Sequence, residues 1–196
     1  MENKKINSIS VKTDLGSFQI ETSEKGLYAL KFPSFRKSSH CEPERRSNPD
    51  LRLPQRGYPH HIKSYEKVLP RRPLGAPRND NEFLSRAQKL LQDYLNGKKI
   101  SFRSLKIDYT GFTKLEREVL QALSRVPSGQ VLSYAQLAKK IGRPKASRFI
   151  GSVMRKNRLP IILPCHRVVR SDGGLGGYSL GLEWKKKLLS MEGSRF

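Results

Sequence analysis

The chain has 196 residues and a formal net charge of +22 at pH 7, from 39 Lys and Arg against 17 Asp and Glu. At roughly 150 residues per domain, this length allows one large domain or two small ones. The positive charge favours a polyanionic partner, most commonly a nucleic acid. No apolar run approaches the ~18 residues needed to cross a bilayer, and no secretion signal follows Met1, so we expect neither a membrane protein nor a secreted one. Two cysteines, Cys41 and Cys165, cannot build a disulfide framework, which favours a reducing, intracellular setting.

The N-terminal part alternates between apolar and polar side chains over residues 6–32, with turn residues between the short runs. This pattern predicts three strands joined as antiparallel hairpins. Residues 80–96 have helical spacing and end in Asn96-Gly97, a helix-stop signal. Residues 100–107 predict an extended stretch that packs back on the sheet. We therefore expect an N-terminal domain of sheet plus helix over residues 1–108.

Residues 33–79 differ in composition from the rest of this part. They hold eight of the twelve prolines and have a net charge of +7, from eleven basic and four acidic residues. Such a segment cannot bury enough apolar surface to offset its ordering entropy, so we predict a disordered insertion. It is either a solvated linker or a basic arm that adds non-specific affinity for phosphates.

The C-terminal part, residues 109–196, contains two helix-start signals of the capping-box type. One is Thr113 to Glu116 and the other is Ser133 to Gln136, where the second predicted helix is short and is closed by Gly142. Pro144 suits the first turn of a third helix. Two short helices joined by a turn that contains glycine predict a helix-turn-helix.

The third predicted helix, over about residues 144–156, has an apolar face and a basic face. Its apolar residues are Ala146, Phe149, Ile150 and Val153, and its polar ones are Lys145, Arg148, Ser152, Arg155 and Lys156. The small residues Gly151 and Ser152 would let the backbone approach a duplex closely. Together with the net charge, this pattern favours DNA contact over the alternative of an ordinary amphipathic helix with a solvated side.

A Cys-His pair follows a short apolar run between two prolines. Residues 159–163 predict a buried, extended segment that leads to Cys165 and His166. A free thiol has a pKa near ~8.5, so a nucleophilic cysteine needs a base, and an imidazole oriented by a carboxylate can supply one. His166, acting through a bridging water, and Glu192 are the candidates. The alternative is that Cys165 is a small buried hydrophobic residue.

The run Pro164-Cys165-His166-Arg167-Val168, with Asn157 before it and Gly176-Gly177-Tyr178 and Glu192-Gly193 after it, resembles the methyl-acceptor segment of O6-alkylguanine-DNA alkyltransferases, the methylated-DNA–protein-cysteine methyltransferases. The resemblance covers about residues 111–196. It implies a mixed α/β (α+β) fold with two parts. These are a small antiparallel-sheet domain, ribonuclease-H-like, and a helical domain (109–196) with the helix-turn-helix.

The resemblance also implies roles for individual residues. The catalytic set is Cys165 as acceptor, His166 and Glu192 as the groups that draw off its proton, and Asn157 as a brace. The base-binding set is Tyr134, which helps to turn the nucleotide out, Ser179 as donor to O6, the carbonyls of Cys165 and Val168 as acceptors from the guanine amine, and Pro160 as pocket wall. The DNA-binding set is Arg148, in the place of the extruded nucleotide, with Ser133, Ala146, Ser147, Gly151 and Arg155.

The implied reaction is direct reversal of DNA damage. A methyl or larger alkyl group passes irreversibly, in a single turnover, from O6-alkylguanine (or O4-alkylthymine) to Cys165 after the nucleotide is flipped out of double-stranded DNA. The protein would bind the minor groove as a monomer. It would need no cofactor, neither metal nor organic, and would work in a bacterial or archaeal cytoplasm or in a nucleus.

Three features depart from the resemblance. Leu180 replaces a small residue and would narrow the pocket, Arg158 replaces a proline and would add a phosphate contact, and the 33–79 insertion has no counterpart. His40, Cys41, His60 and His61 match no zinc signature, so we predict no metal site. Two other functions remain open, namely a helix-turn-helix regulator whose Cys165 is structural or redox-sensing, and a cysteine hydrolase that uses Cys165, His166 and Glu192.

Overall fold

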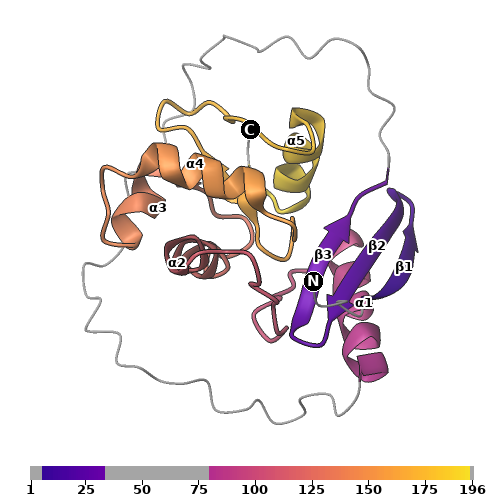
Figure 1. The fold of residues 1–196 in the computed structure, drawn as a ribbon. Coiled ribbons are helices and arrows are strands. Elements are labelled where there is room, and N and C mark those ends of the chain that lie inside the picture. The colour runs from indigo at the N-terminus through magenta and orange to yellow at the C-terminus, as the bar shows by residue number, and fades with distance from the viewer. Residues whose placement is uncertain (1–5, 34–79, 195–196) are drawn as a thin grey trace.

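The computed structural model describes residues 6–33 and 80–194 (Figure 1). A three-stranded sheet forms the N-terminal part, from β1 (Asn7–Thr13), β2 (Gly16–Ser23) and β3 (Gly26–Lys31). The strands are antiparallel and in sequence order, with Val11 opposite Phe18 and Ile20 opposite Leu30. These four side chains are buried, so the alternation in the sequence sets the face that packs inward. The three predicted strands are confirmed.

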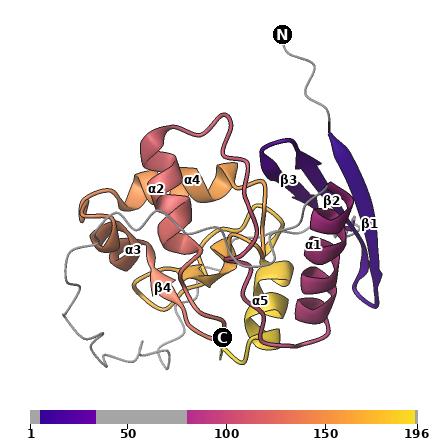
Figure 2. The same ribbon diagram turned by 90° about the horizontal axis from the view of Figure 1, so that it is seen from below.

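Helix α1 (Asp80–Leu95) packs against β1 and β2, and Figure 2 shows it along the sheet. Leu84, Ala87 and Leu91 recur at helical spacing and are buried. After the helix, the chain returns to the sheet as predicted, because Leu27 and Ile107 form a parallel bridge. The insertion at 33–79, including the four residues considered for zinc, lies almost wholly outside the described residues.

Helices dominate the C-terminal part. They are α2 (Lys114–Leu123), α3 (Tyr134–Lys140), α4 (Ser147–Lys156) and α5 (Leu182–Met191), with a 3-10 turn, η1 (Cys165–Arg167), before α5. Both predicted capping boxes form, at Thr113–Glu116 and at Ser133–Gln136. Helix α4 begins at Ser147, three residues later than the Pro144 signal predicted. The mixed α/β class and the pair α3–α4 agree with the sequence analysis.

Two further contacts define the architecture around the site. A short parallel ladder joins β4 (Leu132–Ser133) to β5 (Val168–Val169). The sheet also contacts α5, because Phe18 and Phe32 pack edge-to-face on Trp184 with ring centroids 5.8 and 5.0 Å apart. None of the helices in the described ranges is long and apolar enough to cross a membrane.

Candidate active site

Cys165 begins η1 and is almost completely buried, with 4% of its surface exposed. Asn157, the residue that caps the C-terminus of α4, donates from Nδ2 to the Cys165 sulfur at 3.0 Å and to the Leu163 carbonyl at 2.8 Å. The Asn157 Oδ1 accepts from the Leu159 backbone N–H at 3.0 Å. Asn157 therefore ties the end of α4, which we call the recognition helix of the helix-turn-helix, to the sulfur, and its role as a brace in the reaction stays a prediction.

The segment between Asn157 and Cys165 is buried as predicted, but it is not extended. It forms a tight turn in which the Ile162 N–H donates to the Pro160 carbonyl at 2.9 Å and the Leu163 N–H donates to Leu159 at 2.8 Å. Ile161 has φ 71°, a left-handed conformation that costs energy for a β-branched residue. Its side chain is fully buried, and this packing holds the turn in place.

The Cys165 thiol is protonated at neutral pH. Burial raises the pKa of Cys165, although the hydrogen bond from Asn157 and the positive charge of Lys185 oppose that rise. The Tyr178 hydroxyl also lies beside the thiol, without a hydrogen bond of standard geometry to any described residue. A nucleophilic role for Cys165 therefore requires a base.

His166 and Glu192 form a buried hydrogen-bonded pair, with His166 Nε2 and Glu192 Oε1 2.9 Å apart. Burial opposes ionisation of Glu192, but hydrogen bonds from His166 and Arg167 outweigh it and hold the pKa of Glu192 well below its ordinary value. An ionised carboxylate can only accept, so Nε2 carries the hydrogen and Nδ1 of a neutral ring has a free lone pair. Burial lowers the pKa of His166, which keeps the ring neutral. Nδ1 is buried with no hydrogen-bond partner among the described residues, so it is available to accept a proton.

Two residues that the sequence analysis did not assign to the site also bind Glu192. Arg167 donates from Nε to Oε2 at 2.9 Å and from a terminal nitrogen to Oε1 at 2.7 Å. Tyr94, in α1, donates its hydroxyl hydrogen to Oε1 at 2.7 Å. Arg167 lies within the quoted motif, but only the fold brings α1 to this carboxylate.

Beside Cys165 is a cavity of about 380 Å³, lined by residues from four parts of the chain. Tyr134 comes from the first turn of α3, and the loop after β5 supplies Gly177, Tyr178 and Ser179. The remaining lining residues are Gly151, Met154, Arg155 and Cys165. Five predicted site residues thus share one cavity: Tyr134, Gly151, Arg155, Cys165 and Ser179.

The β4–β5 ladder places the start of α3 next to the cysteine motif, because Leu132 pairs with Val168 and Ser133 with Val169. Lys185, a residue missing from the predicted site, lies under this junction. It is fully buried, and its ammonium donates to the Val168 carbonyl at 2.6 Å and to the Leu175 carbonyl. Burial lowers the pKa of Lys185 to about 8, while the nearby Cys165 opposes that shift. No pattern in the sequence marks this residue, since a lysine in a lysine-rich helix is normally exposed.

The face of α4 that was predicted to contact DNA is accessible. Arg148 and Arg155 are exposed, while Ala146, Ser147 and Gly151 are partly exposed. Lys156, assigned to the same basic face, instead pairs with the buried Glu116 of α2 at 2.5 Å. Ser133 is buried, and its hydroxyl accepts from the Gln136 N–H at 3.1 Å, so its side chain caps α3.

Two predictions based on departures from the resemblance are wrong, namely that Arg158 adds a phosphate contact and that Leu180 narrows the pocket. Pro160, predicted as a pocket wall, lies away from the cavity. Arg158 donates to the carbonyls of Asp108 at 3.3 Å and Thr110 at 2.9 Å. Its guanidinium also stacks on the rings of Tyr28 and Phe112. Arg158 therefore joins two parts of the fold and does not face outward for a phosphate. Leu180 packs against the hydrophobic core and is not among the residues that line the cavity. Pro160 is buried in the turn before Cys165 and does not line the cavity either.

Comparison with known proteins gives consistent results. A sequence profile described as the DNA-binding domain of 6-O-methylguanine DNA methyltransferase matches residues 114–194. The methylated-DNA–protein-cysteine methyltransferase of Methanosarcina acetivorans is 41% identical over 115 residues, which cover 59% of this chain and 72% of that protein. Its counterpart in Methanothermobacter thermautotrophicus is 37% identical over 118 residues, which cover 59% of this chain and 66% of that protein. Among solved structures, Mycobacterium tuberculosis OGT in complex with DNA aligns with a TM-score of 0.65 and 25% identity, over 95% of this chain and 92% of that one.

Proposed function

The chain belongs to the methylated-DNA–protein-cysteine methyltransferase family, and we propose that it repairs DNA by moving the alkyl group of O6-alkylguanine onto Cys165. The observation that carries this proposal is a buried thiol, Cys165, at the wall of a cavity that α4 also lines, followed directly in the chain by an imidazole that Glu192 holds by a hydrogen bond. A helix-turn-helix regulator that only binds DNA would need neither a thiol at the wall of a cavity nor a base beside it. The same reaction on O4-alkylthymine is part of the proposal.

DNA binding is assigned to the exposed face of α4. Its arginines would neutralise phosphates, and the small residues Ala146, Ser147 and Gly151 would let the helix enter the minor groove closely. Arg148, which is exposed on this face, would fill the space left by the flipped nucleotide. The main-chain N–H of Ser133 is occupied by Gln136 at 2.7 Å, so any contribution of Ser133 is to hold the start of α3.

The flipped base would enter the cavity beside Cys165. Extrusion costs a few kcal/mol, and least for a weakly paired, damaged base, which favours the lesion over normal guanine. Tyr134, at the cavity wall, would support the base, and Ser179 would donate to its O6. The Val168 carbonyl, which already accepts from Lys185, has a second lone pair for the guanine amine. Pro160 contributes by packing the turn that carries Cys165.

Chemistry begins with the removal of the thiol proton. Nδ1 of His166 would take it through a water molecule, while Glu192 stabilises the imidazolium from Nε2. The hydrogen bond from Asn157 and the charge of Lys185 favour the thiolate as it forms. The sulfur then attacks the alkyl carbon in line, and an S–C bond replaces the C–O6 bond. The electron pair of the broken bond leaves with guanine, which takes up one proton and so balances the proton lost by the thiol. Alignment of carbon and sulfur in the cavity supplies a large part of the rate.

The product thioether is not readily cleaved, so each molecule acts once. We place the protein wherever chromosomal DNA lies, in a bacterial or archaeal cytoplasm or a nucleus, and we expect a monomer that divides into domains at about residue 108. This boundary would leave the alkyl-acceptor site almost entirely within the C-terminal domain.

The decisive experiment is a stoichiometric transfer assay. The full chain is incubated with a duplex that contains one O6-methylguanine, and its peptides are mapped by mass spectrometry. We expect one methyl group per protein, on Cys165 and not on Cys41, with none in Cys165→Ala, which should still bind the duplex. A protein that binds but stays unmodified would support the regulator, and repeated turnover on an acyl substrate would support the hydrolase.

A further inference from the structure

Tyr94 is the only described residue outside the C-terminal part that hydrogen bonds to the His166–Glu192 pair. It lies in the last turn of α1 and is 3% exposed. Its hydroxyl donates to Glu192 Oε1 at 2.7 Å and lies 3.4 Å from His166 Nε2. The hydroxyl and the imidazole therefore share a single carboxylate oxygen.

The hydroxyl is not needed to hold Glu192 in place. Arg167 binds both carboxylate oxygens, and the Gly129 N–H donates to Oε2 at 3.3 Å, so the side chain is anchored without Tyr94. Burial raises the pKa of Tyr94 well above its ordinary value, and the charge of Glu192 adds to this rise, so the hydroxyl stays protonated and can only donate to the carboxylate. Its effect is therefore to draw electron density from the oxygen that faces His166.

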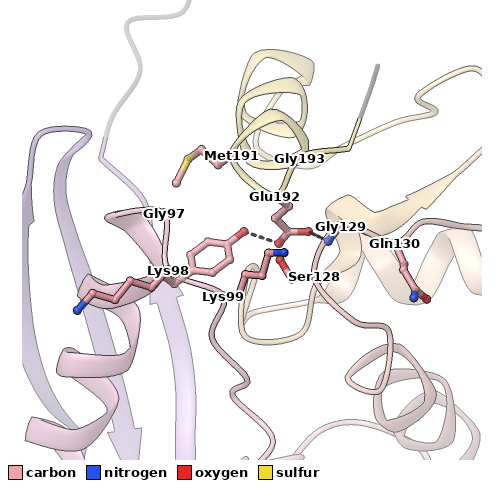
Figure 3. Close-up of a pocket in the computed structure, with 10 residues that line it drawn as sticks. Gly97, Lys98, Lys99, Ser128, Gly129, Gln130, Met191, Glu192 and Gly193 are labelled. Carbon is pink, nitrogen blue, oxygen red and sulfur yellow. Dashed lines mark hydrogen bonds between the residues drawn. The ribbon is translucent and has the colours of Figure 1, made fainter.

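Tyr94 and Glu192 both line a second cavity, together with residues that include Lys98, Ser128 and Gly129. This cavity has a volume of about 440 Å³, and Figure 3 shows Glu192 at its wall, with hydrogen bonds from the tyrosine hydroxyl and from Gly129 as dashed lines. The Glu192 side chain is only 2% exposed in spite of this opening. The Tyr94 ring packs edge-to-face on Phe102 at 5.7 Å, which fixes the direction of the hydroxyl.

We propose that Tyr94 is a positioning residue for alkyl transfer, whose hydroxyl competes with His166 for Oε1 of Glu192 and so limits how strongly the carboxylate holds a protonated imidazole. The inference rests on the proposed function, in which His166 must be neutral before it accepts the thiol proton. The other titratable or charged groups around His166 are Glu192, Arg167, Lys185, Cys165 and Tyr178. A substitution at Tyr94 leaves the two cations, Arg167 and Lys185, in place. A change in the titration of His166 can therefore be assigned to the loss of the hydroxyl.

The test is Tyr94→Phe in the full chain, which removes the hydroxyl and keeps the ring on Phe102. Without the competing donor, Glu192 should bind the imidazolium more strongly, and the acidic limb of the single-turnover rate should move to higher pH. We expect a rate roughly three- to tenfold lower than wild type at about pH 6, equal rates on the alkaline plateau, and unchanged affinity for the duplex. The matched control is Tyr109→Phe, because Tyr109 is half-buried in the segment between α1 and α2 and its ring faces Arg117.

NMR titration of the His166 ring, assigned with His166→Gln, gives a readout that does not depend on transfer. Tyr94→Phe should raise the midpoint of that titration, and Tyr109→Phe should not. An unchanged pH profile and an unchanged titration, with only a lower melting temperature, would show that Tyr94 is merely structural and would overturn the inference. If the wild-type protein transferred no methyl group, but Tyr94→Phe still raised the midpoint of the His166 titration, the proposed function would be wrong and the link between Tyr94 and His166 would stand.

Discussion

Asn157 and Cys165 are joined by a hydrogen bond of 3.0 Å from the asparagine amide to the sulfur, across the turn that follows the recognition helix. A hydrogen bond to sulfur favours the thiolate over the thiol, and here it acts against a burial that favours the thiol. The same amide donates to the Leu163 carbonyl, so one side chain both shapes the turn and tunes the nucleophile.

Asn157→Ala should therefore raise the pKa of Cys165 further and lower stability by about 1–3 kcal/mol, because buried backbone groups lose their partners. The measurement is the pH dependence of iodoacetamide labelling in a Cys41→Ser background. Asn157→Asp is the matched variant, since it keeps the acceptor for Leu159 but places a negative charge at the sulfur, and it should raise the pKa of Cys165 more than alanine does. A labelling midpoint equal to that of wild type in both variants would contradict this role.

Arg148→Ala should slow transfer from a duplex much more than transfer from free O6-methylguanine base. The proposed role of Arg148 is to occupy the gap left by the extruded nucleotide, and extrusion is worth a few kcal/mol, so a loss of about tenfold or more is expected on the duplex alone. Single-turnover rates on the two substrates give the comparison. Arg143→Ala, also exposed but outside α4, is the control. Equal losses on both substrates would mean that Arg148 acts on the chemistry and not on the DNA.

Arg158→Lys should destabilise the protein without weakening its hold on DNA. Lysine keeps the charge but loses the planar group that stacks on Tyr28 at 4.3 Å and on Phe112 at 4.8 Å, and that donates to two carbonyls. The expected cost is about 1–3 kcal/mol in the free energy of unfolding. Thermal unfolding and the salt dependence of duplex binding separate the two roles. A phosphate contact would show the reverse, with unchanged unfolding and, in Arg158→Ala, a shallower salt dependence.

Acid should destabilise the fold in two stages. Burial lowers the pKa of His166 below its ordinary 6.5. Below pH 6.5 the imidazole therefore binds a proton in the unfolded chain but not in the folded one, and the folded state loses stability. The pKa of Glu192 lies well below its ordinary 4.5 when folded, so its stabilisation is complete above about pH 4.5 and is lost as the pH falls toward the folded value. Melting temperatures should fall below pH 6.5 and fall more steeply below pH 4.5. Glu192→Gln should be less stable at pH 7 and should show a shallower second stage, to which Glu116 also contributes because its hydrogen bonds from Lys156 and Thr113 lower its pKa. A second stage as steep as that of wild type would assign it to other carboxylates.

Local signals in the sequence predicted the local structure well. The capping boxes at Thr113 and Ser133 lie within a few residues of the helices that they start, and both helices form there. His166 and Glu192 are 26 residues apart and were candidates for the base and its carboxylate already from their residue types, and the structure joins the two side chains by a hydrogen bond.

What the sequence could not show depends on tertiary contacts or on strain. Tyr94 is 98 residues from Glu192, and nothing in the spacing of α1 marks its hydroxyl as different from any other buried tyrosine. Arg158 and Lys185 looked like surface cations, but the first is held by aromatic rings and carbonyls and the second by two carbonyls. The left-handed Ile161 cannot be foreseen from propensity, because a β-branched residue normally avoids that conformation. These packing and strain effects account for the errors at residues 158–163.

The pairing of Leu132 with Val168 has a mechanical consequence. Parallel strands cannot be joined by a tight turn, so the chain between them must make a long excursion, and here that excursion contains α3, α4 and the cysteine turn. Residues 132–169 are thus a ring of polypeptide closed by two residue pairs. A force applied to α4 by a bound duplex would reach Cys165 by two routes. One runs along the chain through Asn157, and the other runs through α3 and the β4–β5 ladder. We therefore expect α4 and Cys165 to move together as one rigid unit.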